Sequence, residues 1–449
     1  MTAHRSPRLE SIFGNRLDAV TYEQVASLVA NSVTEDYDLD FKGELYGRSD
    51  KARRDLAGDV AAMANTAGGV LVLGIAEDDQ ARAAGLPGVD LSDEEGRRYR
   101  QIVGDLVHPQ PVFETIAVED PQKEGHGFLL IAVPRSPLAP HAVQVDKAFR
   151  YPKRYGTTTT YLPEAQIALA YRERFAGFQR GFEDLERHEA DLIQRLDGTH
   201  QAFVVVTLVP DVSGDFVLDT KAMRQFQQQI TGKDPWLIPR GSYFERATVG
   251  RRRLIAYTGN DPSAAKWQAC ELHQSGAGAI AIAVTDRQSN GLRGADPGPG
   301  ISVIGDEDLV MAVISGLRLV AGHARDRAAV GGNATVRVSL WPVSPEIPAE
   351  LHQWRGAVGR LGSQKVAQPP VASGVFDIDD LAADGPALLA AAAGLSSSLV
   401  QHFGYPEALQ VTSEGAIRTQ YWSAIGIYRP GLLQWAPKVG VLTTEETVG

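Results

Sequence analysis

Two acids and a lysine alternate with apolar residues near the start of the chain, in the stretch EDYDLDFK that runs from Glu35 to Lys42. Alternation of aromatic or aliphatic side chains with charged ones is typical of a half-buried β-strand. Asp38, Asp40 and Lys42 would then emerge on the same face. Neighbouring carboxylates repel each other, so this face predicts a bound divalent metal or a phosphate-binding partner that relieves the repulsion.

An acid-x-Lys pair has the residue types that phosphodiester cleavage needs. Convergent carboxylates can hold a metal that polarises the phosphate and generates hydroxide, and a lysine stabilises the developing charge. Glu35 has the wrong parity for the face of Asp40, so we expect it in the turn before the strand. The alternative is an acidic surface strand that pairs with lysines and is simply solvated.

A second group of residues combines positive charge with aromatic rings. Arg150, Lys153 and Arg154 occur together with Tyr151 and Tyr155, a mixture that single-stranded or looped nucleic acid favours. If these residues form one strand, Arg150 and Arg154 share a face and Lys153 points the other way. The alternative is a solvated edge strand that its charges protect.

Lys51, Arg53 and Arg54 lie in the first turn of an expected helix, where the helix dipole disfavours cations. They are candidates for nucleic-acid binding, although a Lys51–Asp55 pair would also explain them. The segment 65–69 could present backbone amides to phosphate. An ordinary helix end explains its glycines equally well.

The surrounding pattern predicts a compact α+β unit that ends near residue 160. We expect helices over 21–34, from about 50 to 67 and over 93–107, with strands over 37–41, 70–75, 114–118, 128–133 and 148–155. Residues 164–197 follow a heptad-like rhythm, which indicates either a connecting helix packed on its own chain or a homodimer through a coiled coil.

The composition describes a globular chain of two or three domains. It has 449 residues, of which 43% are hydrophobic and 22% are charged. We expect domains at 1–160, 161–198 (the helix), 199–345 (α/β) and 346–449 (α-rich). No membrane span, signal peptide or disulfide is expected, and these features favour the cytoplasm. For residues 200–449 the sequence predicts no function.

The charge balance restricts any nucleic-acid site to a local groove. The net charge is −11, and residues 1–160 carry 18 Lys and Arg against 24 Asp and Glu, a balance of −6. A protein that wraps duplex DNA by electrostatic attraction alone needs a basic surface instead.

Several of these motifs together resemble the Schlafen core, an AlbA-like nucleic-acid-binding domain. They are Asp40-Phe41-Lys42, the segment AMANTAGG at 62–69 with the strand ending Leu73-Gly74-Ile75, and the later segment from Pro140-His141 to Thr158. The resemblance covers roughly residues 20–160. It implies an α+β fold with a mixed sheet and binding of nucleic acid, with RNA favoured and DNA an alternative.

In some members the resemblance also implies metal-dependent endonucleolytic cleavage of structured RNA such as tRNA. The family's first two carboxylates correspond to Glu35 and Asp40, although glutamate is common at the second position. The third is Glu77, Asp78 or Asp79, of which we favour Asp78. These acids would hold Mg²⁺ or Mn²⁺, with Lys42 beside them. The alternatives are a non-catalytic DNA- or RNA-binding regulator and an assembly protein gated by a signal.

Overall fold

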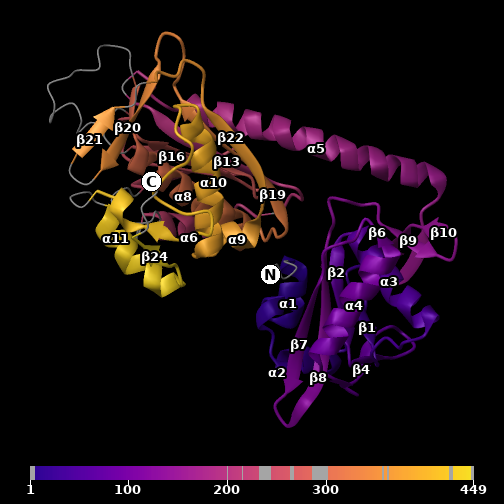
Figure 1. Cartoon of the computed structure of the whole chain (residues 1–449). Helices are drawn as coiled ribbons and strands as arrows, with labels where there is room; N and C mark the ends of the chain where they lie inside the picture. The colour runs from indigo at the N-terminus through magenta and orange to yellow at the C-terminus, as the bar shows by residue number, and fades with distance from the viewer. Residues whose placement is uncertain are drawn as a thin grey trace. The chain divides into compact units, whose positions relative to one another are not determined.

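The computed structural model describes most of the chain, in two compact units that meet between Arg180 and Gly181 (Figure 1). The described residues are 6–199, 201–214, 216–231, 244–262, 267–285, 302–355, 358–361, 364–423 and 428–445. Helix α5 (Glu164–Ile193) belongs to both units, because the boundary falls within it.

The first unit is built on a five-stranded mixed sheet with the order β1-β2-β8-β5, in which β7 also pairs with β8. β1 is parallel to β2, with Leu39 opposite Val70, and the other pairings are antiparallel. This confirms the expected α+β class and mixed sheet. The strands are β1 (Leu39–Lys42), β2 (Gly68–Leu73), β5 (Val89–Asp90), β7 (Glu114–Asp120) and β8 (Lys123–Pro134).

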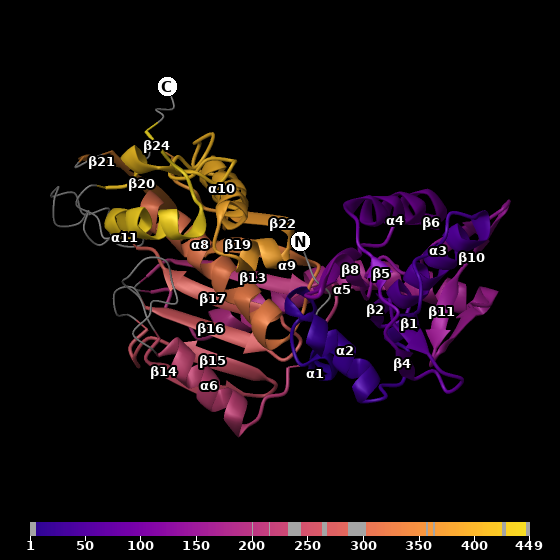
Figure 2. The same ribbon diagram turned by 90° about the horizontal axis from the view of Figure 1, so that it is seen from below.

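Helices cover both faces of this sheet, as Figure 2 shows. They are α1 (Pro7–Phe13) and α2 (Tyr22–Ala30) on one face, and α3 (Asp50–Ala64) and α4 (Asp93–Leu106) on the other. Phe41 on β1 packs toward α1 and α2, whereas Leu71 on β2 packs toward α3 and α4. The parity of β1 therefore directs Asp40 and Lys42 to the α3 side of the sheet.

The helix starts expected from the sequence are confirmed. Thr21 caps α2 with a reciprocal bond to Gln24, and the hydroxyls of Ser49 and Ser92 cap α3 and α4. Each cap satisfies backbone N–H groups that the first turn of a helix leaves free.

Residues 148–155 form two strands that belong to different sheets, so the single strand expected here is wrong. β10 (Ala148–Arg150) joins a three-stranded sheet with β9 (Ala142–Val145) and β6 (Val107–His108). β11 (Pro152–Tyr155) instead pairs with β12 (Thr158–Tyr161) in a hairpin. The change of sheet falls at Tyr151, so Arg150 and Arg154 do not share a face. A separate small hairpin pairs β3 (Ala76–Glu77) with β4 (Ala83–Gly85).

The second unit contains a seven-stranded sheet in which every described pairing is antiparallel, with the order β14-β15-β16-β17-β13-β19-β22. This corrects the α/β layout expected from the alternation of helices and strands. The strands are β13 (Phe203–Pro210), β14 (Arg246–Gly250), β15 (Arg253–Tyr257), β16 (Gln268–His273), β17 (Gly278–Ala283), β19 (Asn333–Trp341) and β22 (Val371–Asp377).

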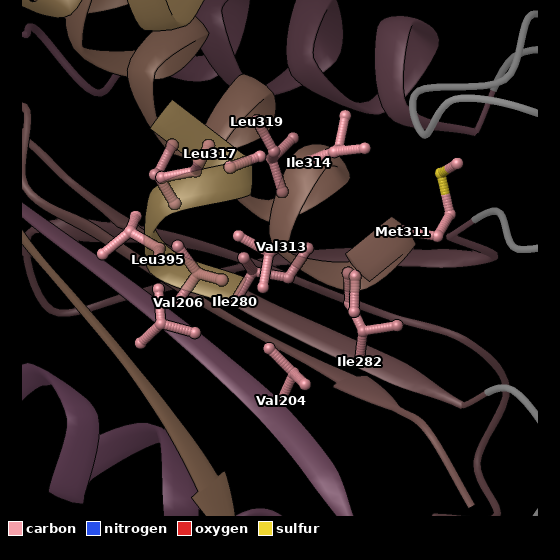
Figure 3. Packing of buried hydrophobic residues seen from close by; sticks show 14 of the residues in the cluster. Val204, Val206, Ile280, Ile282, Met311, Val313, Ile314, Leu317, Leu319 and Leu395 are labelled. Carbon is pink, nitrogen blue, oxygen red and sulfur yellow. The ribbon is translucent and has the colours of Figure 1, made fainter. Parts of the chain in front are cut away.

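One face of that sheet carries the main core of the second unit (Figure 3). Val206 and Ile280 pack against Leu317 of α8 and Leu395 of α10. Residues 346–449 thus share this sheet and core with residues 199–345. The helices of this unit are α6 (Thr220–Ile230), α8 (Asp306–Gly322), the π-helical turn η2 (His323–Arg327), α9 (Ile378–Ala382), α10 (Pro386–Gln401) and α11 (Tyr428–Trp435).

Smaller elements complete the second unit. They are the strands β18 (Ser302–Gly305), β20 (Ala349–Arg355), β21 (Val358–Leu361), β23 (Ile417–Arg418) and β24 (Thr443–Thr444), and the 3-10 turns η3 (Thr419–Tyr421) and η4 (Ala436–Val439). A further 3-10 turn, η1 (Leu17–Ala19), lies in the first unit.

The C-terminal part of α5 packs on the other face of the seven-stranded sheet. Leu192 lies in a cluster with Phe203 and Val205, and Leu185 is buried nearby. Earlier in the helix, Phe175 and Phe182 are 65% and 58% exposed. The homodimer through residues 164–197 stays a prediction. Among the described helices, none combines the length and the apolar character that crossing a membrane requires.

Candidate functional site

Asp40 lies buried between two cations, Lys42 of its own strand and Arg154 of β11. Its Oδ1 accepts a hydrogen bond of 2.7 Å from Arg154 Nη1, and Lys42 Nζ donates to Oδ2. Burial alone would lower the pKa of Lys42, but the charge and hydrogen bond of Asp40 outweigh burial and raise it. The repulsion expected on this strand is therefore relieved by the chain's own cations.

The other acid of the strand face has a separate partner. Asp38 is paired with Arg8 of α1, and the same guanidinium also reaches Asp36 at 2.8 Å. Asp38 and Asp40 thus do not converge on one ligand, although both are nearly buried.

Glu35 lies in the segment before β1, as expected, and is 8% exposed. Its Oε1 accepts a 2.6 Å hydrogen bond from the backbone N–H of Phe41. Burial, followed by the nearby charge of Asp40, raises the pKa of Glu35 to about 7. Glu35 and Asp40 therefore interact, and Glu77 adds a smaller repulsion.

Asp78 has a local partner. It pairs with Arg82 at 2.8 Å and accepts backbone hydrogen bonds from Gln80 and Arg82. The hydrogen bonds from Arg82 lower the pKa of Asp78. Glu77, Asp78 and Asp79 were the candidates for the third metal-binding carboxylate. The charge of Glu77 acts on Glu35, which does not favour the choice of Asp78.

These carboxylates, as arranged, do not fit a Mg²⁺ or Mn²⁺ ion. Both oxygens of Asp40 are engaged by Arg154 and Lys42, and one oxygen of Glu35 is held by the backbone. An oxygen-ligated cation needs several free carboxylate or carbonyl oxygens. Across the parts of the chain that the structure describes, no three His, Cys, Asp or Glu side chains are grouped to hold a metal.

The Asn65–Gly69 segment fixes the β11–β12 hairpin to α3. The Asn65 side chain bonds both the N–H and the C=O of His141 and also donates to the carbonyl of Pro152 at 2.8 Å. Thr66 Oγ1 accepts from the backbone N–H of Arg154 at 3.0 Å. A side chain at Gly69 would meet the Asp38 carbonyl at 2.6 Å, which explains this glycine by close approach of two strands.

Two adjoining surface cavities of about 660 and 370 Å³ lie between α3 and the β10–β12 region. We call them together the α3 groove. Five lining residues belong to both cavities: Arg54, Asp55, Gly58, Pro152 and Tyr161. The other charged residues of the groove are Lys42, Lys51, Arg150, Glu44 and Asp59.

Four cations therefore line this groove, and three of them were predicted to bind nucleic acid. Lys51 and Arg54 project from α3, and Arg150 from β10. Lys51 pairs with Asp55 at 3.9 Å, and Arg54 with Asp146 at 3.4 Å. Such exposed pairs contribute about 0–1 kcal/mol, so a phosphate can compete for these cations.

The other predicted nucleic-acid residues lie elsewhere. Arg154 is 3% exposed and bound to Asp40, so the prediction that it binds phosphate is wrong. Arg53 faces α4, where it meets Asp105 at 3.6 Å. Lys153 and Tyr155 are exposed on the hairpin face opposite Tyr161, as strand parity requires. Tyr151 Oη lies 3.3 Å from that of Tyr171 on α5.

Sequence reasoning missed three residues of the groove. The Tyr46 hydroxyl donates to Asp59 at 2.6 Å in the larger cavity, and burial raises the pKa of Asp59. Tyr161 is 57% exposed and has the Arg150 guanidinium 5.2 Å from its ring centre. A tyrosine at the end of a threonine run was the one available signal for Tyr161.

Residues 35–163 match the family described as Schlafen, AlbA_2, which confirms the resemblance for this segment. No match was found among the curated proteins. Among solved structures, the DIP2311 protein from Corynebacterium diphtheriae is 25% identical, with a TM-score of 0.24. That match spans 36% of this chain and 32% of the other.

A second structure is the N-terminal domain of a protein described as related to the ATP-dependent DNA helicase RecG, from Nitrosomonas europaea. It is 18% identical, with a TM-score of 0.22, and the match spans 31% of this chain and 90% of that one. The family match alone identifies residues 35–163 as a Schlafen/AlbA_2-like domain, and this segment contains the α3 groove.

Proposed function

We propose that the Schlafen/AlbA_2-like domain binds nucleic acid in the α3 groove. The observation that carries this proposal is the set of four cations that line it, Lys42, Lys51, Arg54 and Arg150, beside the exposed ring of Tyr161. Phosphate contacts supply most of the affinity in sequence-independent binding. A groove of this kind meets the need for a local basic site in a chain of net charge −11.

A bound cation or a single small anion is less well supported than nucleic acid as the occupant of the α3 groove. Its acids are either exposed, as Glu44 and Asp55 are, or bonded to a neighbour, as Asp59 is to Tyr46. Lys51 and Arg54 of α3 are held by weak, exposed ion pairs, and Arg150 of β10 contacts the ring of Tyr161. An anionic polymer that spans both cavities gains several phosphate contacts at once, which a single small anion does not.

The test is a titration of a labelled RNA hairpin with the full chain, followed by fluorescence anisotropy between about 50 and 200 mM salt. Arg54→Gln should weaken binding and lower the salt slope by about 0.7–0.9, because one phosphate contact is lost. Arg53→Gln is the matched control. It changes the neighbouring residue of the same helix, which faces α4, and should leave both quantities unchanged. Equal effects of the two substitutions would contradict the proposed groove.

A metal-dependent endoribonuclease acting on structured RNA such as tRNA is the second candidate function. One observation favours it: burial, together with the nearby charge of Asp40, raises the pKa of Glu35 to about 7. The engaged oxygens of Asp40 count against it. The protein's own residues would position the RNA backbone through Lys42, and Glu35 could hold or release a proton near neutral pH.

Incubation of tRNA with the protein and Mg²⁺ or Mn²⁺ decides between the two functions. Glu35→Gln keeps the oxygen that accepts from Phe41 but cannot ionise, so it is the suitable variant. If the wild type cleaves tRNA and Glu35→Gln binds RNA but does not cleave it, the nuclease function is established. Binding without cleavage leaves the domain as a non-catalytic binding module.

A further inference from the structure

We propose that the Arg150–Tyr161 pair is a stacking platform for an unpaired base, so that the α3 groove selects single-stranded or looped segments over continuous duplex. This inference rests on the proposed nucleic-acid function and adds the substrate class. The two residues come from different sheets, β10 and the β11–β12 hairpin, and meet where the two cavities join.

Tyr161 has the exposure and support that a stacking residue needs. Its ring is 57% exposed, and it lines both cavities. The Arg150 guanidinium stands 5.2 Å from the ring centre, a cation–π contact that holds the ring in place and adds a positive charge beside it. An aromatic face next to a cation binds the base of one nucleotide and its phosphate together.

The hairpin that carries Tyr161 is firmly attached to the rest of the domain. Arg154 on β11 is bonded to Asp40, and Asn65 and Thr66 bond the backbone of the same strand. Tyr161 pairs with Pro152, a buried residue of β11 that also lines the groove. A stacking ring on a fixed strand loses little conformational freedom when a base binds.

Duplex nucleic acid does not offer this platform a partner. Its bases are already stacked on each other, and their faces are reached only when a base is extruded or unpaired. Stacking on an aromatic side chain is tolerant of sequence, because every base has a π-face. The groove is therefore expected to discriminate by strand state rather than by base identity.

The test compares three ligands on the full chain by fluorescence anisotropy. They are an oligouridine of about 12 nucleotides, an abasic strand of the same length, and a continuous RNA duplex. Tyr161→Ala should weaken oligouridine binding about tenfold and leave the abasic strand and the duplex unchanged. Tyr161→Phe keeps the ring and should bind as the wild type does. Tyr155→Ala is the matched control, because Tyr155 is more exposed but lies on the opposite face of the same hairpin.

The outcomes separate this inference from the proposed function. If Arg54→Gln weakens binding of all three ligands while Tyr161→Ala changes none, the groove binds nucleic acid but the stacking platform is refuted. The ring would then be free for a protein partner. Equal loss for oligouridine and the abasic strand also refutes stacking. If no ligand binds, or Arg54→Gln has no effect, the proposed function itself fails.

Discussion

Arg154 and Asp40 form a buried ion pair of 2.7 Å between two strands that belong to different sheets and lie 114 residues apart in the chain. The side chains of the two residues are 2% and 5% exposed. This pair joins the β11–β12 hairpin to the central sheet, with Asn65 and Thr66 beside it. Asp40, which the sequence suggested as a catalytic residue, thus helps to hold the β11–β12 hairpin, one wall of the α3 groove, in place.

We expect Asp40→Asn to destabilise the first unit by about 3–5 kcal/mol, because it leaves the Arg154 guanidinium buried without its counter-charge. Asp40→Leu combined with Arg154→Met removes both charges and should recover much of that loss. Urea unfolding followed by circular dichroism measures both. All six tryptophans lie at or after Trp236, so their fluorescence reports the second unit separately. Strictly additive losses would show that the two residues do not act as a pair.

Glu35→Gln should remove a pH dependence of stability. The carboxyl of Glu35 titrates near 4.5 when unfolded but at about 7 when folded, so the folded state binds more protons between these values. The wild type therefore loses stability as pH rises from about 4.5 to about 7. The variant cannot ionise at this position. Its free energy of unfolding should therefore rise relative to that of the wild type over that range, by at most about 3 kcal/mol, and should not rise further above pH 7. Unfolding free energies of both proteins at several pH values test this, and a constant difference between them would contradict it.

The sequence predicted local features better than distant pairings. The alternation around Asp40 led to the correct strand, and the helices expected from residues 21 and about 50 begin there, because these features depend on neighbours in the chain. It could not show that Arg154 reaches Asp40, since a break between two sheets at Tyr151 changes the parity on which that inference relied. Tyr161 was missed for the same reason, because its partner Arg150 lies across that break.

In the second unit, Glu271→Gln should cost much more stability than Arg195→Ala. Glu271 is fully buried on β16 and lies between two arginines. Arg195, just after the end of α5, pairs with one of its oxygens, and Arg253 of β15 lies 3.2 Å from the other. Removing its charge leaves Arg253 partly uncompensated, which should cost about 3 kcal/mol or more. The Arg195 side chain is 42% exposed, and Arg253 remains when it is removed, so we expect a loss within about 1 kcal/mol. Tryptophan fluorescence during urea unfolding gives both values, and similar losses would contradict the assignment of Glu271 as the central charge.

A new charge at Gly58 should tune nucleic-acid binding in either direction. Gly58 lies on α3 within the lining of both cavities, and a Cβ there would meet no atom within 4 Å. Gly58→Lys should tighten binding and raise the salt slope by about 0.7–0.9, because it adds one phosphate contact, and Gly58→Glu should weaken binding. Gly58→Ala is the uncharged control, which should leave affinity unchanged and stabilise the helix by about 0.5–1 kcal/mol. Anisotropy titrations at several salt concentrations measure these effects. Opposite shifts from the two charges would support the groove, whereas equal weakening by both would mean that this position affects binding only through bulk.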